Sequence, residues 1–125
     1  MNSRNRRILL IACAAALLLS AALLLGAGRG RTPVTEDTAI ITVNGREYTR
    51  VPLSAPRTVT VSQSDGSVNV IEVTAEGAVM LSSTCENQLC VHMGQVTRDN
   101  WEFRPNGAFI ICLPNRVSVE LAVVE

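Results

Sequence analysis

The chain contains no lysine, one histidine and only four aromatic residues in a length of 125. Its 11 basic residues, all arginine, balance 11 acidic residues, so the formal net charge is zero. A neutral chain with so few stacking rings does not fit a nucleic-acid-binding protein. The single histidine and the lack of an acidic cluster argue against a conventional hydrolase, so we expect no enzymatic activity and no cofactor. The hydrophobic fraction of 47% excludes general disorder.

Polar residues are almost missing from the first part of the chain. Only Ser20 interrupts the 18 residues from Ile8 to Leu25. A run of this length can cross a bilayer as a helix, because lipid offers backbone polar groups no other partner. We therefore expect a transmembrane helix that contacts the lipid bilayer over residues 8–28.

The charges beside this run indicate its orientation. Three arginines precede it, at positions 4, 6 and 7, and two follow it, at positions 29 and 31. This bias favours a cytoplasmic N-terminus, with the rest of the chain outside the cell membrane. The alternatives are a cleaved signal peptide and a lipoprotein signal at Leu10-Ile11-Ala12-Cys13. The length of the run, which continues for a dozen residues after Cys13, favours an uncleaved single-pass anchor.

Beyond the apolar run, the sequence predicts a small β domain. We divide the chain into a cytoplasmic tip and anchor (1–31), a linker (32–37) and a domain (38–125). Short alternating stretches in this domain are separated by turn sequences such as Asn44-Gly45, which is typical of a tight hairpin. This spacing predicts a mainly β fold, a small antiparallel barrel or sandwich behind one N-terminal transmembrane helix.

The segment Ser82–Trp101 breaks the strand pattern. Its Ser83-Thr84-Cys85-Glu86 sequence fits a capping box, which predicts a helical turn that starts there and ends near Gly94. Trp101 and Phe103 follow, and aromatic side chains of this kind often anchor an interaction surface. The alternative is that both rings cover the core of a domain that has few other aromatic residues.

Three cysteines in the predicted domain are its main candidates for chemistry. Cys85 and Cys90 form a C-x4-C pair, and on the oxidising side of a membrane we expect a disulfide between them. Such a bridge needs a turn or a broken helix, because residues five apart in a regular helix are too distant. Cys112 lies in an apolar stretch, where we expect a buried, reduced thiol. The other pairing would join Cys112 to Cys85 or Cys90.

The sequence leaves other roles for these thiols open. With His92, the three cysteines would supply a Cys3His zinc set, although His92 lies only two residues from Cys90. We favour the disulfide and expect no metal. A Cys-His nucleophile pair would lack a third, orienting group. An unpaired thiol in an exported domain also fits a thiol-redox or electron-transfer accessory component that uses Cys85, Cys90 and Cys112.

Two motifs of the predicted domain resemble the NusG domain II family. They are Cys85-Glu86-Asn87-Gln88-Leu89-Cys90-Val91 with the following Gly94, and Cys112-Leu113-Pro114-Asn115-Arg116-Val117. The resemblance covers residues 38–125 and implies a small, mostly β, barrel-like domain. In many Gram-positive bacteria such a domain occurs alone behind a single membrane anchor, and the resemblance implies no activity for it. It implies no role in transcription either, because the chain has no NusG amino-terminal domain.

These features together predict a membrane-tethered extracytoplasmic interaction or accessory module. Its expected partners are the lipid bilayer and an unknown protein, and no nucleic acid. Residues 32–125 hold six arginines against 11 acidic residues, a net charge of −5.

Overall fold

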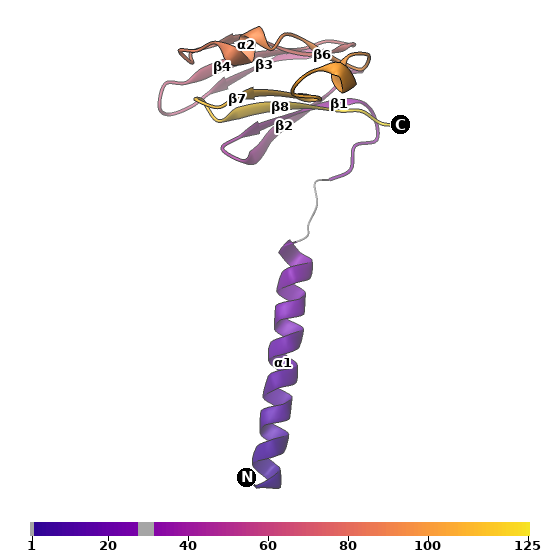
Figure 1. Ribbon diagram of the computed structural model, residues 1–125, viewed down its shortest axis with the longest axis vertical. Coiled ribbons are helices and arrows are strands. Elements are labelled where there is room, and N and C mark those ends of the chain that lie inside the picture. The colour runs from indigo at the N-terminus through magenta and orange to yellow at the C-terminus, as the bar shows by residue number, and fades with distance from the viewer. Residues whose placement is uncertain (1, 28–31) are drawn as a thin grey trace. The chain divides into compact units, whose positions relative to one another are not determined.

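The computed structural model describes residues 2–27 and 32–125. The chain divides into two compact units, Met1–Pro33 and Val34–Glu125, and each is described by itself (Figure 1).

The first unit contains the helix α1 (Ser3–Ala27). Its stretch Ser3–Leu24 is long and apolar enough to cross a membrane, and none of that stretch is buried. Leucines are exposed all around it, so the helix has no polar face to turn toward water. This confirms the prediction of an N-terminal helix that is long and apolar enough to cross a membrane. Residue 28 of the expected lipid-contacting span, Arg29 and Arg31 lie outside the described residues.

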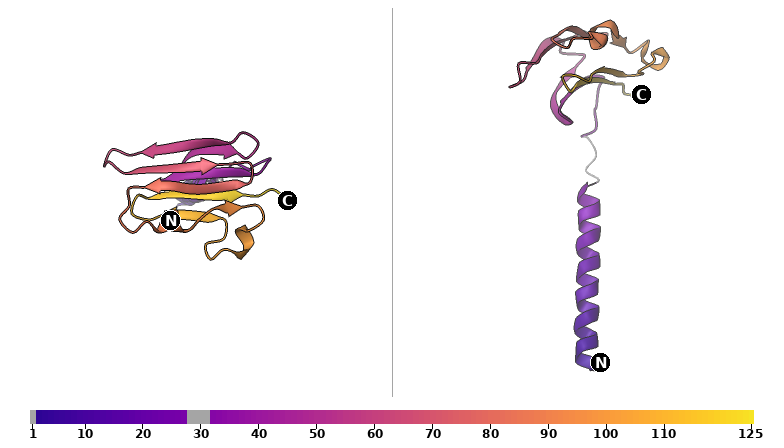
Figure 2. Two further views of the ribbon diagram at one scale, coloured as in Figure 1. Left: turned by 90° about the horizontal axis from the view of Figure 1, so that it is seen from above. Right: turned by 60° about the vertical axis from the view of Figure 1, so that its left-hand side comes forward.

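The second unit consists mainly of two antiparallel sheets, which Figures 1 and 2 show as two layers. Within residues 34–125, each sheet has four strands. The first sheet has the order β2 (Arg46–Pro52), β1 (Thr38–Val43), β8 (Val117–Ala122), β7 (Phe109–Cys112). The second has the order β3 (Arg57–Ser62), β4 (Val68–Val73), β5 (Gly77–Ser83), β6 (Val96–Thr97). The predicted mainly β class is therefore confirmed.

The core lies between the facing sides of the sheets. Alternate residues of β4 and β8 are buried, as the period of two in a strand requires. Ile41 and Ile110 come from one sheet and Ile71 and Met80 from the other, and all four side chains are fully buried. Burial of one such side chain contributes about 1.5–3 kcal/mol to folding. Both sheets therefore depend on this shared apolar layer.

The turn at Asn44-Gly45 is the predicted hairpin. It joins β1 to β2, with Val43 paired to Arg46. Asn44 has φ 52° and Gly45 has φ 77°, so both residues adopt the positive φ that a two-residue turn of this type needs. The sequence prediction for this hairpin is confirmed.

The segment between β5 and β7 contains two short helices, α2 (Leu89–His92) and η1 (Trp101–Phe103). The predicted helical start at Ser83 is wrong, because Ser83 is the last residue of β5. Its hydroxyl accepts a hydrogen bond from the backbone N–H of Cys85 (3.2 Å) instead of capping a helix. The predicted end is confirmed, since α2 stops two residues before Gly94, which has φ 71°.

We predict that Gly45→Val lowers the stability of the β domain. A Cβ at this position would meet no atom within 4 Å, so the cost comes from the positive φ alone, about 1–2 kcal/mol. Thermal unfolding followed by Trp101 fluorescence should show a lower midpoint, by about 4–8 °C per kcal/mol for a domain of this size. Thr60→Val on the exposed side of β3 is the control and should change stability by less than about 0.5 kcal/mol. Equal midpoints for both variants would contradict the turn assignment.

Candidate functional site

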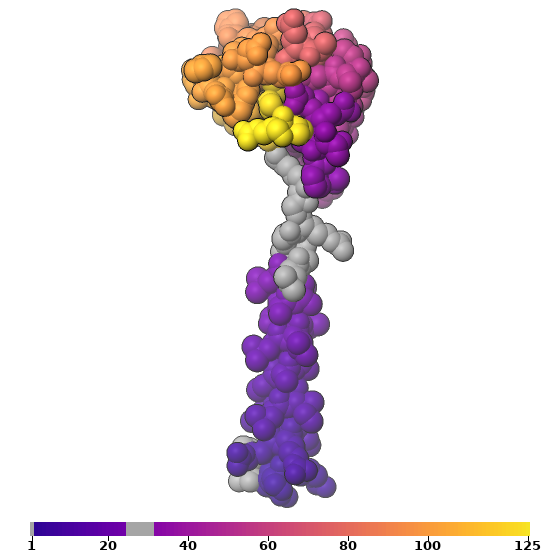
Figure 3. All heavy atoms as spheres, turned by 90° about the vertical axis from the view of Figure 1, so that its right-hand side faces the viewer, coloured from indigo at the N-terminus to yellow at the C-terminus, as the bar shows by residue number. Residues whose placement is uncertain are grey.

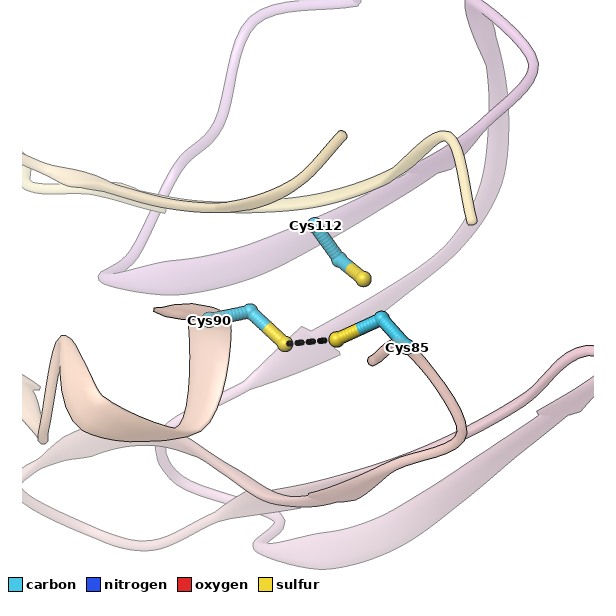
Figure 4. Close-up of side chains that lie close together, drawn as sticks. All are labelled: Cys85, Cys90 and Cys112. Carbon is cyan, nitrogen blue, oxygen red and sulfur yellow. Dashed lines mark hydrogen bonds between the residues drawn. The ribbon is translucent and has the colours of Figure 1, made fainter. Parts of the chain in front are cut away.

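Three cysteine side chains from separate parts of the fold meet inside the β domain (Figure 4). Cys85 follows β5, Cys90 lies in α2 and Cys112 is the last residue of β7. Their exposed fractions are 5%, 1% and 1%. The three sulfur atoms lie within 4.8 Å of one another, and those of Cys85 and Cys90 are 3.7 Å apart. The structure therefore brings together all three thiols that the sequence singled out in this domain.

A tight turn places Cys85 and Cys90 on the same side of the chain. Gln88 has φ 55°, and its side-chain Nε2 donates hydrogen bonds to the carbonyl oxygens of Ser83 (2.7 Å) and Cys85 (2.5 Å). The side-chain oxygen of Asn87 accepts the backbone N–H of Leu89 (3.1 Å), at the start of α2. Because α2 contacts both β5 and β7, it brings Cys90 to Cys112.

The structure does not show the predicted disulfide between Cys85 and Cys90. Both are free thiols, and their 3.7 Å separation is well above the ~2.05 Å of a disulfide. The turn at Gln88 brings the two side chains together without a bond between them. The predicted burial of Cys112 is confirmed, and Cys112 is a free thiol like Cys85 and Cys90. Cys13 is also free, and it is exposed on α1.

A buried network of polar side chains lies beside the thiols. The Ser83 hydroxyl is 3.5 Å from the sulfur of Cys112 and accepts a hydrogen bond from the Asn69 amide (3.1 Å). The Asn115 amide donates to the side-chain oxygen of Asn69 (2.9 Å) and to Ser83 (3.3 Å). Three of the four residues, Asn69, Cys112 and Asn115, are at most 5% exposed. The network thus satisfies polar groups that would otherwise destabilise the core.

The sequence reasoning missed Asn69 and Asn115 as members of this site. One signal was present for Asn69, which shares the inward-facing positions of β4 with Ile71 and Val73. A polar residue in that register must find a partner in the core. That partner, Asn115, lies 46 residues away in the sequence, so only the fold reveals the pair.

The surroundings affect the thiols differently. Burial raises the pKa of the Cys90 thiol to about 12. Burial acts in the same direction on Cys112, but hydrogen bonding from Ser83, Asn69 and the backbone of Asn115 outweighs it, and the pKa of Cys112 is lowered. Cys112 is therefore the more readily ionised thiol of the two.

An apolar groove of about 190 Å³ opens next to the thiols. Leu89 and Leu113 contribute side chains that are 57% and 80% exposed. Cys90 and Cys112 also line the groove, although each is only 1% exposed. The remaining lining includes Met93, Ile111 and Pro114. The groove therefore leads from the surface toward two of the three thiols.

The other predicted site residues lie away from the thiols. Trp101 is half-buried and packs against the core, whereas Phe103 is 84% exposed. The two rings therefore do not form one surface, although both belong to η1. This segment (orange in Figure 3) lies beside the C-terminal residues, and Trp101 borders a surface hollow with Leu121 and Val123. His92 is exposed on α2 and does not belong to the thiol cluster.

The sequence model of the NusG domain II family matches residues 8–124. The chain belongs to the NusG domain II family. Its motifs around Cys85, Cys90 and Cys112, which suggested the resemblance, are the ones that build the thiol cluster. Among curated proteins, none matches this NusG domain II chain.

Solved structures of related bacterial proteins share the fold of this NusG domain II chain. The Lin0431 protein from Listeria innocua is 27% identical, with a TM-score of 0.60, and the match covers 72% of this chain and 99% of that protein. A DUF1312 family protein from Ruminococcus gnavus is 33% identical, with a TM-score of 0.51 and coverages of 68% and 96%. A DUF1312 family protein from Enterococcus faecalis, at 20% identity and a TM-score of 0.60 with coverages of 71% and 99%, supports the fold alone.

We predict that Asn115→Ala lowers the free energy of unfolding by about 1–3 kcal/mol, because it leaves the buried oxygen of Asn69 without its amide partner. Urea unfolding measures this loss. Asn106→Ala, which removes an exposed amide at the groove, is the control and should stay within about 0.5 kcal/mol of the original protein. Similar losses in both variants would show that the Asn69–Asn115 pair does not stabilise the core.

Proposed function

We propose that this NusG domain II protein is a non-catalytic module that is tethered to the cell membrane by α1 and binds a protein partner outside the cytoplasm. The observation that carries the proposal is the exposed apolar helix α1 on a chain whose other unit, Val34–Glu125, has its own buried core. A helix with apolar side chains on all sides is stable in lipid rather than in water. The β domain needs no lipid to bury its apolar residues.

The proposed orientation has the N-terminus in the cytoplasm. Arg4, Arg6 and Arg7 lie in the first turns of α1, before the apolar stretch. Arginines close to a membrane span are retained on the cytoplasmic side. The β domain, which follows the span, would then lie on the opposite side.

The proposed binding surface is the apolar groove beside α2. Leu89 and Leu113 expose more than half of their side-chain surface at the groove. Exposed apolar groups that surround a concave site are typical of protein interfaces. The partner we propose is a protein that inserts an apolar side chain between these leucines. The free thiols do not by themselves indicate a thiol-redox role, and we do not propose one.

The orientation is tested by labelling introduced cysteines in intact cells. Ser64→Cys is on an exposed turn of the β domain, and Ser3→Cys is at the exposed start of α1. A membrane-impermeant maleimide should label the full chain with Ser64→Cys and should label Ser3→Cys only after permeabilisation. The unsubstituted chain is the control for its own thiols. The opposite pattern, or recovery of the chain in the soluble fraction, would contradict the proposal.

The binding surface is tested by photocrosslinking in membranes of the native host. Leu113→benzoylphenylalanine should yield a discrete crosslinked protein, and Leu89→Asp in the same chain should abolish it by placing a charge in the groove. Leu81→benzoylphenylalanine is the matched control, since Leu81 is a leucine of similar exposure to Leu89 that does not line the groove. Identical products at positions 81 and 113, or no product at 113, would rule out the groove as the binding surface.

A further inference from the structure

We infer that Cys85, Cys90 and Cys112 form a binding site for one thiolate-preferring d10 metal ion, with Zn²⁺ as the ion that the local charge favours. This inference does not rest on the proposed partner, because the three thiols lie close together whether or not a protein occupies the groove that two of them line.

The spacing of the sulfur atoms agrees with metal coordination. A Zn–S bond of about 2.3 Å places two thiolates of a tetrahedral site about 3.8 Å apart. The sulfurs of Cys85 and Cys90 are 3.7 Å apart, and all three lie within 4.8 Å of one another. Figure 4 shows the three side chains pointing toward a common centre. Small rotations of the side chains would therefore complete the coordination.

Hydrogen-bonding side chains surround the cluster. Such groups can stabilise thiolates, whereas cysteines that only pack in an apolar core do not need them. The Ser83 hydroxyl lies 3.5 Å from the sulfur of Cys112, and the Gln88 amide lies 3.9 Å from that of Cys85. The side-chain amides of Asn69 and Asn115 donate hydrogen bonds to the Ser83 hydroxyl and fix its position. Hydrogen bonds to ligating groups orient them and stabilise the charged form that a metal needs.

The groove supplies an entry path and an open coordination position. Cys90 and Cys112 line it, so an ion can reach the sulfurs from the surface. His92, the fourth ligand of a Cys3His set, is exposed and lies outside the cluster. The fourth position of a tetrahedral ion would therefore be taken by water or by a group that enters through the groove, as in zinc sites with three protein ligands.

The charge of the site favours a divalent ion. Three thiolates with Zn²⁺ leave a net charge of −1, whereas three thiolates with Cu⁺ leave −2. Burial of the larger charge costs more free energy in an apolar environment. Thiolate ligands bind both ions well, so the smaller net charge of the buried zinc site is what favours Zn²⁺ over Cu⁺.

The test uses the reduced full chain in detergent, with Cys13→Ser to remove the thiol outside the cluster. Anaerobic titration with Co²⁺ should produce a sulfur-to-cobalt charge-transfer absorption that saturates at one ion per chain. Zn²⁺ should displace the cobalt and raise the unfolding temperature. Cys112→Ser should weaken binding by more than about 100-fold, and Ser83→Ala, which keeps all three thiols, by about 10-fold.

Far-UV circular dichroism must first show that each variant retains its β structure, so that the loss of binding is not a loss of folding. If Cys112→Ser does not fold, the cobalt titration of the reduced chain that keeps all three cluster thiols tests the site by itself. No charge-transfer absorption on the reduced, folded chain, or full binding that persists in folded Cys112→Ser, would overturn the site. Binding of Cu⁺ together with no response to Co²⁺ or Zn²⁺ would overturn the assignment of zinc.

Discussion

The β domain depends on the packing of its two sheets against each other. Each sheet has one face of alternating apolar residues, and neither face can be left in water without a large cost in free energy. The facing sides meet through Ile41 and Ile110 on one sheet and Ile71 and Met80 on the other. One strand end from each sheet lies at the same place in the core. β5 ends at Ser83 and β7 ends at Cys112, and the Ser83 hydroxyl and Cys112 sulfur are 3.5 Å apart.

The thiol cluster is a consequence of that arrangement. The chain leaves β5, turns at Gln88 and places α2 against both β5 and β7. Cys85 and Cys90 on this segment thereby meet Cys112 from the other sheet. The buried amides of Asn69 and Asn115 link the sheets at the same place through a hydrogen bond of 2.9 Å. The hydrogen bond between Asn69 and Asn115 therefore belongs both to the core and to the candidate site.

Local features of the sequence were sufficient to predict the mainly β class and the hairpin between β1 and β2. The Asn44-Gly45 turn and the strands expected from short alternating stretches depend on neighbouring residues only, and both predictions are confirmed. Predictions that depend on distant residues were less successful. The capping box at Ser83 was wrong because the hydroxyl of that serine bonds to Asn69 and to the backbone of Cys85. A local pattern cannot reveal that competition, since Asn69 reaches Ser83 only through the pairing of β4 with β5.

In the candidate site too, features set by neighbouring residues were predicted and features set by distant residues were not. The sequence identified Cys85, Cys90 and Cys112, but it suggested a bond between the first two rather than a cluster of three free thiols. It also grouped Trp101 with Phe103, whereas the short helix η1 directs one ring to the core and the other to solvent. The groove at Leu89 and Leu113 escaped detection because its two sides come from α2 and from the turn after β7.

The convergence of three thiols on one ion is measured most directly by X-ray absorption spectroscopy at the zinc edge. The full chain with Cys13→Ser, loaded with one equivalent of Zn²⁺, should show three sulfur ligands at about 2.3 Å and one lighter ligand. This result would agree with Cys85, Cys90 and Cys112 around the same ion, as the proposed site predicts. A zinc environment with fewer than three sulfur ligands would contradict the account.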